Sequence, residues 1–99
     1  MGKSVYAVRA FFSTYYEEDA KALIEKLSKL EGELRSSRSR VVPELYYVEI
    51  IVDGPSKLEE VAENTRFLLE EASRGGRVYG IKVYTVPPLE AGSEKASSG

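Results

Sequence analysis

Hydrophobic and polar residues alternate in three stretches of the chain and recur every three or four positions in two others. The alternation predicts β-strands over residues 4–12, 45–52 and 77–86, because successive side chains of a strand point to opposite faces. The longer spacing predicts amphipathic helices over about residues 15–31 and 56–73. The middle strand, LYYVEIIV, is the most apolar of the three and ends abruptly in the turn sequence DGP. It is therefore expected to lie at the centre of the sheet.

The ends of both predicted helices carry recognisable signals. Thr14 with Glu17, and Ser56 with Glu59, have the spacing of a capping box, in which the two side chains satisfy free amide groups of the first turn. Gly32 is expected to end the first helix in a left-handed conformation.

Residues 33–42 have the weakest pattern in the chain. A short edge strand is expected around residues 37–42, followed by a turn at Pro43 and Glu44 that leads into strand 45–52. Arginines on such an edge would discourage pairing with other chains.

The resulting order β-α-β-β-α-β predicts an α+β, ferredoxin-like two-layer sandwich: an antiparallel four-stranded sheet with both helices on one face. In this arrangement strands one and three are central, strand four flanks strand one, and strand two flanks strand three. One domain is expected over residues 1–88, and residues 89–99 have the composition of a disordered polar tail.

The sheet face that no helix covers, called the open face below, is expected to be too apolar to stay in contact with water. Tyr46, Val48, Ile50 and Val52 should pack under the helices, and strand 77–86 should place Tyr79 on the same side as Ile81 and Val83. The residues expected on the open face are Val5, Ala7, Arg9, Phe11, Tyr47, Glu49, Ile51, Lys82 and Tyr84.

Two partners fit that face. A second copy of the chain would bury it, with Glu49 between Arg9 and Lys82 as a cross-strand ion pair. A single-stranded RNA could instead stack its bases on Phe11, Tyr47 and Tyr84. The net charge of −2, the carboxylate in the middle of the face and its aliphatic residues favour a protein partner, and no DNA partner is expected.

The amino-acid composition excludes several kinds of catalytic and metal-binding site. The chain has no cysteine and no histidine, which excludes disulfides, thiolate metal sites and the commonest general base. Its adjacent carboxylate pairs on the helices are explained by solvated helix faces, so no catalytic residue, metal or cofactor is expected and the protein is predicted not to be an enzyme.

No apolar run approaches the roughly 18 residues of a membrane helix, and no signal peptide is visible, which favours a cytoplasmic location without a membrane partner. The absence of glutamine and the single asparagine match proteins from hot environments.

Two further groups of residues are candidates for binding. Arg35, Arg38 and Arg40 stand among serines and could contact phosphate, although a solvated edge explains them as well. Phe67 lies off the apolar stripe of the second helix and could anchor a protein partner.

Residues 61–69, VAENTRFLL, resemble the second helix of the small dimerisation subunit of the KEOPS complex, where an Asn-Ser or Asn-Thr pair precedes large apolar residues. The pair Phe11-Phe12, the segment 18–20 and Asp53 follow that family in order over roughly residues 5–72. The resemblance implies a non-catalytic subunit that dimerises and supports the catalytic subunit of a tRNA threonylcarbamoylation machine. It places Asn64, Thr65, Phe67 and Leu68 on or beside a protein surface.

The sequence thus predicts a non-enzymatic, homo-oligomeric accessory or assembly module, which could serve a tRNA-modifying complex. A single-stranded RNA-binding domain is one alternative. A small-molecule-sensing regulatory domain is another, since it shares the fold but has no residue signature here.

Overall fold

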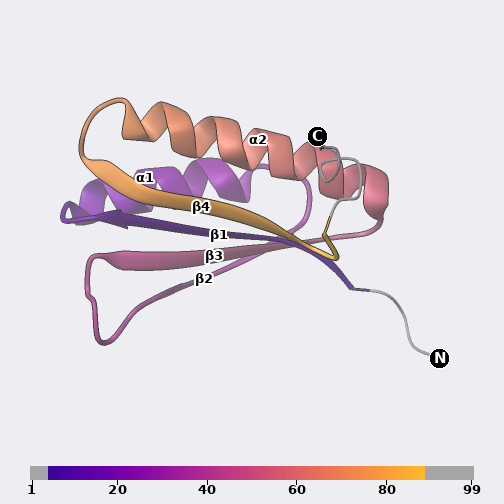
Figure 1. Cartoon of the computed structure of the whole chain (residues 1–99), viewed down its shortest axis with the longest axis horizontal. Helices are drawn as coiled ribbons and strands as arrows, with labels where there is room; N and C mark the ends of the chain where they lie inside the picture. The colour runs from indigo at the N-terminus through magenta and orange to yellow at the C-terminus, as the bar shows by residue number, and fades with distance from the viewer. Residues whose placement is uncertain (1–4, 89–99) are drawn as a thin grey trace, which may run out of the picture.

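The computed structural model describes residues 5–88, which form four strands and two helices (Figure 1). The strands are β1 (Tyr6–Thr14), β2 (Glu33–Arg38), β3 (Leu45–Val52) and β4 (Val78–Val86), and the helices are α1 (Glu17–Ser28) and α2 (Pro55–Ser73). The polar tail predicted for residues 89–99 lies outside the described residues. Neither helix combines the length and hydropathy that crossing a membrane requires.

The strands form one sheet in the order β2-β3-β1-β4, and every neighbouring pair is antiparallel. Both helices lie on the same side of this sheet (Figure 1). The fold is therefore the predicted α+β, ferredoxin-like arrangement, and β3 is a central strand with the bounds that its sequence pattern indicates.

The core lies between the sheet and the helices. β3 alternates strictly between buried and half-buried residues, so that its even-numbered side chains face the helices as predicted. α2 contributes the apolar stripe that its sequence spacing indicates, ending with Leu69, and α1 contributes Leu23 and Leu27. Each large aliphatic side chain that is fully buried in this way stabilises the fold by roughly 1.5–3 kcal/mol.

Both predicted capping boxes are wrong. α1 has Tyr16 at its N-cap and α2 has Gly54, and neither receives a side-chain cap. Thr14 is the last residue of β1, and its hydroxyl accepts a hydrogen bond from the Tyr16 amide at 3.2 Å instead of capping the helix. α2 starts at Pro55 because proline fits the first helical position, where its missing amide proton is not needed.

The end of α1 also differs from the prediction. The helix ends at Ser28, before Gly32, and Lys29 keeps a right-handed conformation. Gly32 (φ +129°) instead brings the chain against β3: a Cβ there would lie 2.7 Å from both the Ile50 Cγ2 atom and the Ile51 carbonyl oxygen. Glycine is thus required for the close approach of β2 to β3.

β2 begins four residues earlier than expected, and the predicted edge strand at residues 37–42 is wrong over most of its length. Arg38 ends the strand, because its guanidinium donates to the Pro43 carbonyl and to the Glu17 carboxylate and lies over the Tyr46 ring. The Ser39 hydroxyl then accepts hydrogen bonds from the amides of Val41 and Val42, and this bonding holds the following residues in a loop.

β4 contains an irregularity that exchanges the faces of the two residues before Gly80, so that Val78 joins the core. The register between β1 and β4 shifts between Phe11 and Ser13, next to Gly80, whose φ is +64°. Tyr79 therefore lies opposite Ser13, on the open face, and the prediction that it shares a face with Ile81 and Val83 is wrong.

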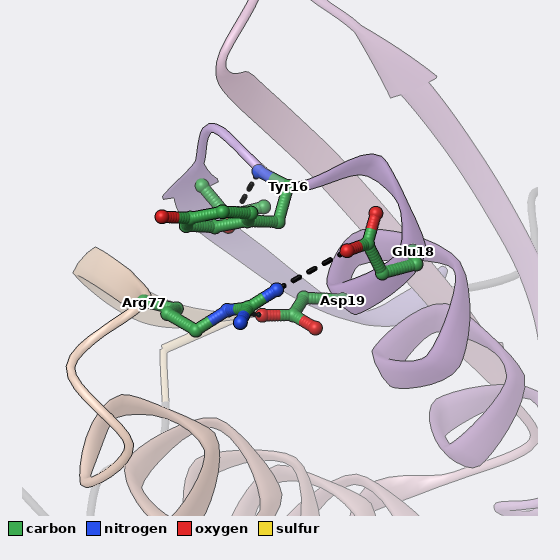
Figure 2. Close-up of polar contacts among 5 residues, drawn as sticks. Tyr16, Glu18, Asp19 and Arg77 are labelled. Carbon is green, nitrogen blue, oxygen red and sulfur yellow. Dashed lines mark hydrogen bonds and ion pairs between the residues drawn. The ribbon is translucent and has the colours of Figure 1, made fainter.

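A cluster around Arg77 joins the start of β4 to the start of α1 (Figure 2). The Arg77 guanidinium lies 3.7 Å from the centre of the Tyr16 ring and forms ion pairs with Glu18 at 3.2 Å and Asp19 at 2.7 Å. The charged side chains are between 31% and 73% exposed, so solvent weakens their ion pairs. The cluster is therefore a modest structural contact between two elements that are distant in the sequence.

Candidate interaction surface on the open face

The strand register places the residues of the open face in three rows that run across the sheet. Partners in an antiparallel ladder point to the same face, so each row can be read directly from the pairing. In the order β2, β3, β1, β4, the aliphatic row is Glu33, Ile51, Ala7 and Val86, the charged row is Arg35, Glu49, Arg9 and Tyr84, and the aromatic row is Ser37, Tyr47, Phe11 and Lys82.

The charged row alternates in sign at the middle of the face. The Arg9 Nε atom donates to the Glu49 carboxylate at 3.3 Å. On the other side Glu49 lies opposite Arg35 in the ladder, and the Arg35 guanidinium is 3.6 Å from the Glu33 carboxylate. β1 separates β3 from β4, so Lys82 lies opposite Phe11 and not beside Glu49. The expectation that Glu49 stands between Arg9 and Lys82 is therefore wrong, and Arg35 occupies the place that was expected for Lys82.

The aromatic side chains contact one another across three strands. The Phe11 ring lies 4.9 Å from Tyr47, with a tilt of 46°, and 6.1 Å from Tyr84 in an edge-to-face arrangement. Such contacts contribute roughly 0.5–1.5 kcal/mol beyond the burial of the rings. Tyr84 remains 49% exposed, so the cluster presents a large apolar surface to solvent.

The aliphatic row continues this surface toward the other end of the sheet. Ala7 is only 1% exposed although it is not part of the core cluster under the helices. Its small side chain is shielded by the larger Ile51 and Val86 on the neighbouring strands. Val5 comes directly before β1 and is 63% exposed.

The sequence pattern missed two tyrosines at the far end of the open face. Because of the register shift, Tyr79 lies there, and its ring is 6.0 Å from that of Tyr15. A side-chain hydrogen bond to Tyr15, together with partial burial, raises the pKa of Tyr79 to about 12. Gly80 was the available signal, since an isolated glycine inside a strand pattern often marks a bulge.

The three arginines of residues 35–40 do not form one cluster. Arg35 points to the open face, whereas Arg38 is on the helix side of the sheet, held by Glu17 and Tyr46. The hydrogen bond from Arg38 holds the pKa of the Glu17 carboxyl below its usual range. Arg40 lies in the loop after β2 and is exposed. Phosphate binding by these residues stays a prediction, without a shared surface to support it.

The second candidate surface on α2 is divided by the helical geometry. Asn64 and Phe67 are exposed, Phe67 by 57%, while Thr65 is fully buried and Leu68 is half-buried. The Thr65 hydroxyl has no hydrogen-bond partner within residues 5–88. Asn64 and Phe67 are thus the members of this set that a partner could reach.

The shallow depressions elsewhere on the molecule do not suggest a ligand site. One is lined by Glu31, Gly32, Val52, Asp53 and Lys57, but the Lys57 ammonium is held by Glu31 and Glu60, and the hydrogen bond to Glu31 raises the pKa of Lys57. Within residues 5–88, no group of three side chains from His, Cys, Asp and Glu is arranged to hold a metal ion.

Comparison with known proteins confirms the fold. No protein-family model matches the chain, and neither does any curated protein. Among solved structures, the de novo designed protein Foldit4 superposes with a TM-score of 0.63 at 17% identity, over 83% of this chain and 96% of that one.

Two natural proteins are similar in the same way. PA3566 from Pseudomonas aeruginosa matches with a TM-score of 0.60 at 14% identity, over 89% of this chain and 97% of that one. A protein from an uncultured marine organism, described as a dimeric ferredoxin-like protein, matches with a TM-score of 0.52 at 12% identity, over 84% of this chain and 86% of that one. At these identities the likeness concerns the ferredoxin-like fold alone.

Proposed function

We propose that this chain is a non-enzymatic accessory module that works as a homodimer, with the open face as the surface through which two copies associate. The observation that carries this proposal is the apolar and aromatic surface around the Arg9–Glu49 ion pair, which lies on the face opposite both helices. The dimeric ferredoxin-like neighbour supports it to the extent that the same fold is described there as dimeric.

The size of the open face suits this use. Four strands spaced by about 4.8 Å, with up to nine residues at about 3.4 Å each, present roughly 590 Å² in projection, and the relief of the side chains increases this value. A stable protein interface buries about 800 Å² on each partner. The whole face, and not a part of it, would therefore be needed for a stable dimer.

The charge distribution favours a protein over RNA as the partner. Arg9 is paired with Glu49, so a phosphate group would have to compete with this carboxylate for the central cation. The Glu49 carboxylate, which is 20% exposed, lies next to the Phe11 and Tyr47 rings and would repel a nucleic-acid backbone. The same arrangement suits a protein surface that carries both signs of charge.

A role in tRNA modification is the finer part of the proposal. It is supported by the resemblance of residues 61–69 to the KEOPS dimerisation subunit and by the exposure of Asn64 and Phe67 on α2. In this assignment the open face joins two copies, and α2 remains on the outside of the dimer. Co-expression with the KEOPS catalytic subunit of the same organism tests it: a stable complex that Phe67→Ala weakens is expected, and separate elution of the two proteins would contradict it.

The dimer itself is tested by placing a charge on the open face. Ile51→Glu should convert the dimer into a monomer at tens of micromolar protein, because it buries a carboxylate among apolar side chains of both copies. Light scattering after size-exclusion chromatography measures the mass. Val41→Glu is the matched control, since Val41 is 88% exposed in the loop between β2 and β3 and belongs to none of the three rows of the open face.

The control should remain dimeric, and circular dichroism should show both variants folded. A wild-type protein that is monomeric under these conditions, or an Ile51→Glu variant that stays dimeric, would refute the open face as the interface.

A further inference from the structure

The charges of the open face restrict how two copies can meet. In a closed dimer with the two sheets face to face, the twofold axis lies in the plane between them. It can run across the strands or along them. The two directions of the axis bring different strands of the partner over β1 and β3. They therefore differ in which charges of the charged row face each other.

An axis across the strands places every strand over its own copy. Arg9 would then face the partner's Arg9, Glu49 the partner's Glu49, and Arg35 the partner's Arg35. Like charges facing each other in a desolvated interface cost several kcal/mol. An axis that crosses the strands at the charged row is therefore strongly unfavourable.

An axis along the strands, between β1 and β3, has the opposite effect. It places β1 over the partner's β3 and β2 over the partner's β4, since the strand order is β2-β3-β1-β4. Residues of the same row then face each other. Arg9 meets the partner's Glu49, and Glu49 meets the partner's Arg9.

We infer that this protein pairs with a second copy through a twofold axis parallel to β1 and β3, in which Arg9 and Glu49 of each subunit form reciprocal ion pairs with the partner's Glu49 and Arg9. The inference rests on the proposed use of the open face and specifies its geometry. Four charges of alternating sign then lie at the centre of the interface, each next to two of opposite sign.

The central residues of the remaining rows are complementary under the same axis, whereas at the edges Glu33 faces the partner's Val86 and Ser37 faces the partner's Lys82. In the aromatic row, Phe11 faces the partner's Tyr47, which extends the ring contacts already present within one subunit. In the aliphatic row, Ala7 faces the partner's Ile51, a small side chain against a large one. At the edges, Arg35 faces the partner's Tyr84, whose exposed ring can receive a guanidinium group.

The ion pairs determine which surfaces combine more than how tightly they do so. Desolvation offsets much of the attraction between buried charges, whereas a mismatched charge remains without a partner and is strongly unfavourable. Two aligned sheets pack at about 30°, so residues near the centre stay opposite each other better than those at the corners. The Arg9–Glu49 row is central, which is where it can set the alignment.

Charge reversal tests the geometry, because an axis along the strands predicts that the double variant Arg9→Glu with Glu49→Arg associates with itself and not with the wild-type protein, whereas an axis across the strands predicts the reverse. In Arg9→Glu alone, both cross-subunit pairs become carboxylate pairs, and in Glu49→Arg alone both become guanidinium pairs. Each single variant should associate with itself at least about tenfold more weakly than the wild-type protein. An equimolar mixture of the two should recover the dimer as a mixed species, because one subunit then carries both negative groups and the other both positive groups. Native mass spectrometry distinguishes the mixed dimer from either homodimer by mass.

The double variant with both Arg9→Glu and Glu49→Arg is the matched control. It keeps the ion pair within one subunit and restores opposite charges across the axis, so it should dimerise like the wild-type protein. Circular dichroism checks that both single variants are folded, which is expected because the intramolecular pair is partly exposed.

The possible failures are distinguishable. If the wild-type protein is a dimer, Ile51→Glu dissociates it, and the mixture of single variants stays monomeric, then the geometry is wrong while the open face remains the interface. Self-association of either single variant at wild-type strength would overturn the geometry in the same way. A monomeric wild-type protein would overturn the proposed function together with the inference.

Discussion

The helix-covered face and the open face of this sheet are made by alternate residues of the same strands, yet they differ in kind. Phe12 and Phe11 are neighbours in β1 and show the difference most directly. Phe12 is fully buried and stacks on Tyr46, with the ring centres 5.4 Å apart, whereas Phe11 is half-buried and tilted against Tyr47. The covered face consists of side chains in close contact, and the open face carries a similar aromatic pair beside charged groups.

The two faces meet different requirements. A face that is permanently covered needs only apolar groups of complementary shape, as in the row of Val8, Ile50 and their neighbours. A face that must remain soluble alone and still recognise one partner benefits from charges that make wrong alignments unfavourable. The Arg9–Glu49 pair at the middle of the open face has this property.

The largest predicted effect separates these two faces. Phe12→Ala should lower the free energy of unfolding by about 3–5 kcal/mol, because it leaves a cavity beneath both helices. Phe11→Ala should cost the isolated subunit much less, about 1–2 kcal/mol, since part of its ring is already in water. Urea unfolding at low protein concentration, where any dimer is dissociated, measures both values.

When self-association is measured instead of stability, the substitution at Phe11 should have the larger effect and the substitution at Phe12 the smaller one. Phe11→Ala removes a ring from the proposed interface and should weaken the dimer, whereas a folded Phe12 variant with a smaller change, Phe12→Leu, should not. Equal losses of subunit stability in the two alanine variants would show that the faces are not distinct in the way described.

A smaller effect is expected at Gly32, which lies against the Ile50 side chain and the backbone of β3. Gly32→Ala should destabilise the protein by about 1–3 kcal/mol, because the new Cβ would collide with the Ile50 side chain and the Ile51 carbonyl at a positive φ. Gly75→Ala is the control. Its Cβ would lie an ordinary 3.6 Å from the nearest atom, and the change should stay within about 0.5 kcal/mol. Thermal unfolding compares the two; similar melting temperatures for both variants would mean that the approach of β2 to β3 can relax.

The covered face was predictable from the sequence, because the spacing of apolar residues along each strand and helix shows which side must be buried. The alternation of β3 and the stripe of α2 each place one apolar side toward a single core, and two amphipathic helices leave one arrangement in which both sides are buried. The order of strands follows from this arrangement. Neither conclusion depends on the details of turns or helix ends.

The parts that could not be predicted depend on single contacts between distant residues. Val41 and Val42 have the composition of a strand end. However, the Arg38 guanidinium donates hydrogen bonds to the Glu17 carboxylate and the Pro43 carbonyl, and β2 ends at Arg38. That shift brings Arg35 into the charged row beside Glu49. The capping boxes failed for a similar reason, since the Thr14 hydroxyl is engaged by the Tyr16 amide at the end of β1.

The smallest predicted effect concerns Tyr79, which the register shift moves to the open face. Its hydrogen bond to Tyr15 raises its pKa to about 12, above the ordinary value of 10.0. Because the folded protein binds this proton more tightly than the unfolded chain, the associated stability is present below pH 10 and is lost as the pH rises toward 12. Tyr15→Phe should lower the pKa of Tyr79 toward 10 and leave the covered face unchanged. Tyrosinate absorbance in a pH titration measures this shift, with Tyr84→Phe as the control that removes a different tyrosine of the same face. If Tyr15→Phe leaves the highest tyrosine pKa unaltered, the side chains of Tyr15 and Tyr79 are not hydrogen-bonded.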